Sequence, residues 1–162
     1  MAERDYRIRQ YLPHQRPNWV DGNDPLFITL CHKRRGIHHF DNASAWEAVL
    51  KAANHLADLD KWQPLVILAM PDHLHGIVKI PSAQRIESVF CSFKRDIGHT
   101  LPTVWQRDGF DRRLRSHEYL VKTIDYIAQN PVRAGLTTTP KTGLTRRIGG
   151  RSARAARGAA PT

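Results

Sequence analysis

Apolar residues gather in short segments whose spacing predicts alternating strands and helices. Residues 26–31 (LFITLC) form a run of β-branched and aromatic side chains, which predicts a first strand. The apolar run 65–70 (LVILAM), the Pro-Asp break after it and the extended segment 73–80 (HLHGIVKI) together predict a hairpin. A weaker fourth strand is predicted at 103–106, ahead of a loop rich in Arg and Asp.

Three further stretches place apolar residues at helical intervals of three and four. The first stretch begins after Asp41 and Asn42, either of which is placed to cap a helix. Ser82 is placed to cap the second and Gly98 to close it, and the third opens near Ser116. The apolar stripes of the three helices are formed by Trp46, Val49, Leu50, Ala53 and Leu56; by Ile86, Val89, Phe90, Phe93 and Ile97; and by Leu120, Ile124 and Ile127.

This order of elements predicts the α+β class, with a ferredoxin-like antiparallel sheet (βαββαβ) and an additional C-terminal helix that carries Tyr126. Two helices would cover one face of the sheet, leaving the other face for a ligand or another helix. We expect residues 25–136 to form this domain. Residues 1–24 would be an N-terminal arm, and residues 137–162 a basic, disordered tail of Arg among small residues.

The chain has 25 Lys and Arg against 15 Asp and Glu, a formal net charge of +10, which favours polyanionic partners such as nucleic acid. Many ordinary soluble domains are equally basic, so the charge indicates a nucleic-acid partner only in combination with a functional site. No apolar run has the length of a membrane span, and the N-terminus lacks the apolar stretch of a signal peptide. We therefore expect a cytoplasmic protein with no membrane partner.

Two histidines alternate on the second strand of the predicted hairpin. Because side chains alternate across a strand, His73 and His75 leave the same face of the sheet. Two neutral imidazoles with one oxygen ligand suit a divalent metal such as Mg²⁺ or Mn²⁺ that keeps open positions. A His-x-His pair is also common in packing or on a surface, so the pattern by itself leaves both interpretations open.

The last helix carries two tyrosines. Tyr126 and Asn130 are four residues apart and flank the apolar stripe, so the tyrosine is available for chemistry. A packed, amphipathic tyrosine is the alternative, and Tyr119, one heptad earlier, is a rival nucleophile. Asn130 precedes Pro131 and so could equally cap a short turn.

Several separated segments resemble the REP-associated tyrosine transposases, a branch of the HUH single-tyrosine transposases. These segments are MPDHLHG (70–76), GFDRRLRSHEYL (109–120) and YIAQNPVRAGL (126–136), supported by Trp105, LPH (12–14) and FIT (27–29). The resemblance extends from about Leu12 to Leu136. It implies the ferredoxin-like HUH nuclease fold and a metal-dependent endonuclease and strand transferase that acts on single-stranded, hairpin-forming repeat DNA.

The resemblance also implies individual roles. His73 and His75 would be the metal-binding pair, Asn130 would complete the metal site, and Tyr126 would attack the scissile phosphate to form a 5′-phosphotyrosine. One departure is Asp72, where relatives often have Asn, and its role is open. Arginines around the tyrosine segment would hold the DNA backbone, namely Arg107, Arg112, Arg113, Arg115 and Arg133.

Two other functions are compatible with the same pattern. The first is a non-catalytic nucleic-acid-binding regulator, although the central strands lack the stacking aromatics of an RNA-recognition sheet. The second is a metal-dependent hydrolase in which water attacks and Tyr126 is structural. The pattern does not decide between a monomer and a homodimer.

Overall fold

The four strands and three helices of the computed structural model follow the predicted order. The structure describes residues 24–139, so the predicted basic tail, apart from its first residues, and nearly all of the N-terminal arm lie outside it. The elements are β1 (Leu26–Cys31), α1 (Ala43–Asp58), β2 (Gln63–Met70), β3 (His73–Lys79), α2 (Ile86–Thr100), β4 (Phe110–Arg113) and α3 (His117–Arg133).

The strands form one antiparallel sheet in the order β2-β3-β1-β4. This is the ferredoxin-like arrangement, in which the two middle strands are β1 and β3. The register pairs Thr29 of β1 with His75 of β3 and Cys31 with His73. It also pairs Thr29 with Phe110 of β4. The predicted fold is confirmed, and the register fixes which side chains become neighbours on each face.

Local signals predicted from the sequence set the helix starts. Asn42 caps α1 by accepting a hydrogen bond from the Ala45 backbone N–H at 2.9 Å, and Ser116 caps α3 by accepting one from Tyr119 at 3.3 Å. Gly135 follows the end of α3 at a φ of +68°, a conformation that favours glycine.

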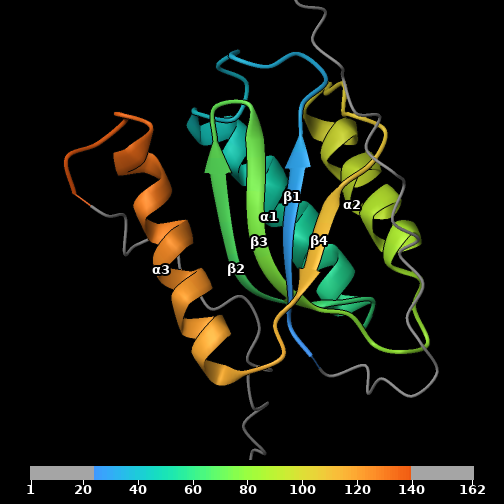
Figure 1. Cartoon of the computed structure of the whole chain (residues 1–162). Coiled ribbons are helices and arrows are strands. Elements are labelled where there is room, and N and C mark those ends of the chain that lie inside the picture. Colours follow the sequence, from blue (N-terminus) through green and yellow to red (C-terminus); the bar gives the residue numbers. More distant parts are fainter. Residues whose placement is uncertain (1–23, 140–162) are drawn as a thin grey trace, which may run out of the picture.

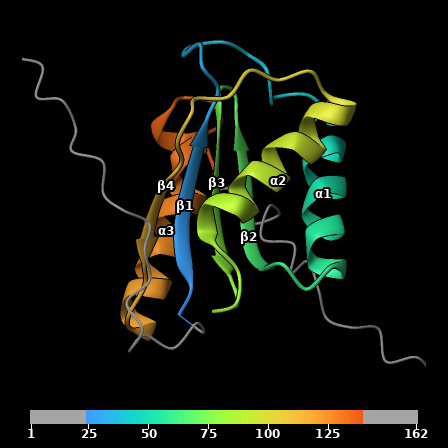
Figure 2. The same cartoon turned by 90° about the vertical axis from the view of Figure 1, so that its right-hand side faces the viewer.

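The two faces of the sheet are covered differently. Figures 1 and 2 show α1 and α2 together on one face and α3 alone on the other. The α1–α2 side holds the larger apolar core, which includes Leu30, Val49 and Phe93. A smaller apolar cluster with Leu68 and Ile127 anchors α3 to β2 and β3. One helix cannot cover four strands, so part of this face is left for polar groups.

The edge strand and the second helix differ from the sequence predictions. The fourth strand is Phe110–Arg113, whereas in the predicted segment 103–106 Trp105 forms only an isolated bridge with His32. The prediction was wrong because β4 is short and charged, as edge strands often are, and does not show an apolar run. Helix α2 begins after Arg85 rather than Ser82, and Gly98 lies inside it.

Replacing Ile127 with Ala should test the attachment of α3. Ile127 is 2% exposed within the smaller cluster, so the Ile127→Ala variant should lose about 2–5 kcal/mol of unfolding free energy in urea denaturation. Val121 lies on the same helix but is 42% exposed, and Val121→Ala should change stability by no more than about 0.5 kcal/mol. Equal losses in the two variants would contradict this packing of α3.

Candidate functional site

The two histidines of β3 converge on the face covered by α3. The Nε2 atoms of His73 and His75 are 3.2 Å apart, and the rings meet edge to face. Each ring is held through its other nitrogen: Nδ1 of His75 lies 2.9 Å from the Thr29 hydroxyl, and Nδ1 of His73 lies 2.6 Å from an Asp72 carboxylate oxygen. The prediction that both imidazoles share one face is confirmed.

Asp72, whose role the sequence left open, holds the histidine pair from behind. Its other carboxylate oxygen accepts a hydrogen bond from the Gly36 backbone N–H at 2.7 Å and lies 3.2 Å from Arg35 Nε. Burial by itself would raise the pKa of Asp72, but the Gly36 N–H, His73 and Arg35 outweigh it and lower the pKa below its ordinary value. Asp72 is therefore a carboxylate that orients His73.

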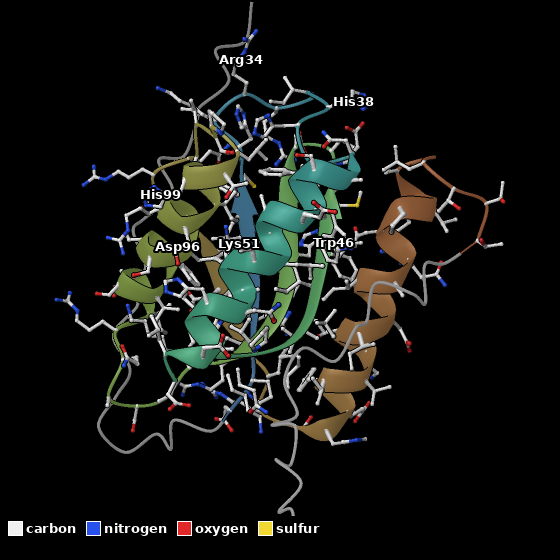
Figure 3. All side chains as sticks on the ribbon, turned by 180° about the vertical axis from the view of Figure 1, so that it is seen from behind. Arg34, His38, Trp46, Lys51, Asp96 and His99 are labelled. Atoms are coloured by element: carbon white, nitrogen blue, oxygen red, sulfur yellow. The ribbon has the colours of Figure 1, made fainter. Side chains whose placement is uncertain are left out.

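The loop that follows β1 makes this arrangement possible. It folds over the β2–β3 turn, where the His39 and Phe40 backbone N–H groups both donate to the Pro71 carbonyl, at 2.8 and 3.0 Å. Figure 3 shows Arg34 and His38 of this loop at the end of the sheet where β2 turns into β3. Gly36 turns the loop with a φ of +74°, which brings its N–H to Asp72.

The charge state of His75 suits a cation. Burial, followed by the neighbouring His73 and Arg35, lowers the pKa of His75 from its ordinary value to about 4. At neutral pH, His75 is therefore an uncharged imidazole, with Nδ1 engaged by Thr29 and Nε2 directed at Nε2 of His73. A carboxylate behind a ligating histidine, as Asp72 is behind His73, is the usual support of a metal-binding imidazole.

The distances also fit a metal ion. Two nitrogens that bind one ion at about 2.1 Å are separated by about 3.0–3.4 Å, depending on the angle between them, and the pair here is 3.2 Å apart. Within residues 24–139, no group of three or more His, Cys, Asp or Glu side chains could hold an ion. An ion on this pair would therefore need an amide, water or substrate oxygen to complete its ligands.

Tyr126 faces the histidine pair from α3. Its ring centroid lies 6.1 Å from that of His75 and 6.0 Å from that of Phe27, and its side chain is 41% exposed. The Arg133 guanidinium lies 5.4 Å from the centroid of the Tyr126 ring. Tyr126 is thus partly accessible, beside the histidines and next to a cation.

Tyr119, the rival nucleophile, lies farther along the same groove. Both tyrosines line a pocket between the sheet and α3, but the ring of Tyr119 lies against Arg112, 5.8 Å from the guanidinium carbon. Among the ring contacts of the described residues, only Tyr126 pairs a tyrosine with a histidine. The geometry therefore favours Tyr126.

Asn130 lies inside α3 and does not cap a new turn. The helix continues through Pro131 to Arg133, and the Asn130 side-chain amide donates to the Tyr126 carbonyl at 3.0 Å. Pro131 lines a pocket together with Met70 and Pro71, so this end of α3 lies near the β2–β3 turn. A role for Asn130 in metal binding stays a prediction, because its side-chain amide is hydrogen-bonded to the backbone of its own helix.

The five predicted DNA-binding arginines do not form one cluster. Arg112 lines the pocket, and Arg133 covers Tyr126. Arg113 points away from that pocket, where its Nε lies 3.8 Å from an Asp24 oxygen. Arg107 and Arg115 are exposed in the loops that flank β4. Arg112 and Arg133 are therefore the two that border the tyrosine.

Sequence reasoning missed several residues of this site. Thr29 and Phe27 lie on β1, and they join His75 and Tyr126 only through the strand register. Phe110 was assigned to a loop, yet it lies on β4 beside Thr29. Alternation along β1 could have placed Phe27 and Thr29 on one face, but their pairing with the histidine strand required the sheet order.

A fold similar to this ferredoxin-like arrangement is found among solved structures. The structure of a REP-associated tyrosine transposase bound to a REP hairpin aligns with a TM-score of 0.65 at 20% identity, over 76% of this chain and 75% of that chain. A candidate transposase from Deinococcus radiodurans aligns with a TM-score of 0.49 at 13% identity, over 70% of this chain and 94% of that chain.

The likeness to the REP-associated transposase establishes a shared fold. No protein-family model matches the sequence, and no curated protein matches it. Among the described helices, none combines the length and apolar character needed to cross a membrane.

Acid should destabilise the fold through His75. The pKa of His75 is lowered to about 4, against about 6.5 in an unfolded chain, so protons bind preferentially to the unfolded state as pH falls between these values. The stabilisation is complete above pH 6.5 and lost as pH falls through 4, a loss of about 3 kcal/mol. In urea titrations without metal, a His75→Gln variant should lose correspondingly less stability from pH 7 to pH 4.

Proposed function

We propose that the protein is a metal-dependent single-stranded DNA endonuclease and strand transferase that acts through a phosphotyrosine at Tyr126. The observation that carries this proposal is the placement of Tyr126 against His75, with the two histidine Nε2 atoms 3.2 Å apart beside it. The fold shared with a REP-associated tyrosine transposase supports the same function.

The residues present fit a divalent ion such as Mg²⁺ or Mn²⁺. His73 and His75 would hold it, and Asn130 is a candidate for a further ligand from α3. A bound ion of this kind supplies Lewis acidity, which draws negative charge from a phosphate oxygen. Asp72 and Thr29 would contribute by engaging Nδ1 of each imidazole, which leaves the two Nε2 atoms as the ligands.

Tyr126 performs the bond exchange. Its hydroxyl oxygen attacks the scissile phosphorus, the bond from phosphorus to the 3′ oxygen breaks, and the 5′ end stays on the tyrosine as a phosphodiester. The phenol proton is lost to solvent, and the departing 3′ oxygen takes one up to become a hydroxyl. Reversal by a 3′ hydroxyl rejoins strands and releases the tyrosine without ATP, because one phosphodiester replaces another.

Two arginines at the tyrosine help this step. The Arg133 guanidinium, 5.4 Å from the ring centroid, stabilises negative charge that develops on the phenol oxygen. Arg112, on the wall of the pocket, can hold a backbone phosphate next to the reacting one. The exposed Arg107 and Arg115 add a favourable potential for DNA along the β4 loops.

Single-stranded DNA beside a hairpin is the proposed substrate. The transposase with the shared fold is bound to a REP hairpin, and the net charge of +10 suits a polyanion. A single strand also suits the site, because a pocket wall between the sheet and α3, where Tyr126 lies, can be reached by one flexible strand more readily than by a duplex.

Metal binding should depend on the carboxylate behind His73. Asp72→Asn should weaken Mn²⁺ binding by about 10- to 100-fold in isothermal titration calorimetry, because the His73 ring loses its orienting anion. Asp41→Asn is a matched control, since Asp41 also pairs with a histidine, His38, but in an exposed part of the loop. Unchanged Mn²⁺ binding in a His73→Ala, His75→Ala double variant would rule out this metal site.

Covalent capture of DNA should identify the nucleophile. With Mn²⁺ and a labelled hairpin-repeat oligonucleotide that carries single-stranded flanks, wild-type protein should give a DNA-linked band on a denaturing gel. Tyr126→Phe should give none, because only the hydroxyl is removed, whereas Tyr119→Phe should retain the band.

Other outcomes select the alternatives. Cleavage without a linked band that persists in Tyr126→Phe would mean that water attacks, as in a metal-dependent hydrolase. Tight binding without cleavage in wild-type protein, across metals and several repeats, would identify a non-catalytic regulator.

A further inference from the structure

The pocket beside Tyr126 extends well beyond the histidine pair. It has a volume of about 560 Å³ and runs from His75 across β1 to the edge strand β4. A pocket of this size is larger than a single phosphate needs and can hold a small organic group such as a nucleotide. The far end is lined by Phe110 and Arg112 of β4 and by Tyr119, Lys122 and Thr123 of α3.

Phe110 lies in the same cross-strand row as His75. Thr29 is the cross-strand partner of both His75 on β3 and Phe110 on β4, so the three residues form one row across the sheet. Two strand spacings separate the backbones of His75 and Phe110, a distance of about 10 Å. Phe27 connects the two ends, because its ring lies 6.0 Å from Tyr126 and 6.2 Å from Phe110 between centroids.

Packing does not account for Phe110. Its side chain is 48% exposed, and neither apolar cluster of the described residues includes it. The backbone beneath it is nevertheless fixed: a Cβ on Gly109 would lie 2.6 Å from a methyl carbon of the buried Leu30 and 3.0 Å from the Phe90 ring. The fold thus presses Gly109 against the core and presents the next ring at a fixed position on an open edge.

Two cationic side chains line the pocket together with the Phe110 ring. Arg112 lies two residues along β4 on the same face, and Lys122 of α3 lines the same pocket. Lys122 pairs with Glu118, but both side chains are largely exposed, so this ion pair is weak and Lys122 can turn to a phosphate at little cost. An accessible aromatic face with two cations beside it matches the base and backbone of a single-stranded nucleotide.

We propose that this end of the pocket is a nucleotide subsite, in which Phe110 stacks on the base of a nucleotide next to the scissile phosphate while Arg112 and Lys122 hold its backbone. The subsite rests on the proposed function, because it takes its strand from the Tyr126 site. Stacking on a phenyl ring accepts any base, so the subsite positions the strand without selecting its sequence.

Binding of matched oligonucleotides tests the subsite. One probe is a fluorescent DNA hairpin with single-stranded thymidine flanks, and the other has abasic residues in the flanks; EDTA prevents cleavage. Phe110→Ala and Phe110→Leu should weaken binding of the first probe by about 5- to 150-fold in fluorescence anisotropy. Phe110→Trp should bind within about twofold of wild type, since it keeps an aromatic face.

The abasic probe separates stacking from general damage. Wild-type protein should bind the abasic probe less tightly than the thymidine probe, by a factor similar to the loss that Phe110→Ala causes on the thymidine probe. Phe110→Ala should bind the two probes with nearly equal affinity. Val121→Ala, an exposed apolar change on α3 outside the pocket, should leave both affinities unchanged. The subsite would be overturned if Phe110→Leu bound the thymidine probe as tightly as wild-type protein. It would also be overturned if removing the bases weakened binding by the same factor in wild-type protein and in Phe110→Ala.

The two proposals fail in different ways. Suppose that Tyr126 forms no DNA adduct, but that removing the bases weakens binding only when the Phe110 ring is present. The nuclease proposal then falls, and the subsite stands as a single-strand binding site. If the adduct forms and no coupling is found, the nuclease stands and the subsite falls.

Discussion

The antiparallel pairing of β1 with β3 is the constraint on which the site depends. It sets Thr29 opposite His75 and Cys31 opposite His73, so that the Thr29 hydroxyl meets Nδ1 of His75. A slip of one residue would send both imidazoles into the apolar layer beneath α1 and α2. Burial of Leu74 and Val78 of β3 on that opposite face opposes such a slip, and thus the core holds the histidines in place.

Much of the fold could be predicted from the sequence, because the elements of the core carry strong patterns. The apolar runs of β1, β2 and β3 and the capping residues Asn42 and Ser116 are local signals, and they place these elements correctly. Strand β4 carries no such signal. It is held by its pairing with β1, which is a property of the assembled sheet and not of its four residues.

The candidate site was predictable in part for the same reason. Alternation along one strand is enough to place His73 and His75 together, and helical spacing is enough to bring Tyr126 off the apolar stripe. The support of the pair was not predictable, because the Asp72 carboxylate is fixed by Gly36 and Arg35 of a loop thirty-odd residues earlier in the chain. Residues joined through tertiary contacts, such as Phe110 and Thr29, leave no trace in local periodicity.

The short edge strand has one more consequence, for the behaviour of the protein in concentrated solution. An open strand edge can recruit a strand from another molecule and start aggregation, and long, flat, apolar edges are the most prone to do so. Strand β4 has only four residues, three of them charged, and ends in the turn toward α3. Its charges therefore discourage edge-to-edge association between copies of the chain while leaving the same edge open to a polyanion.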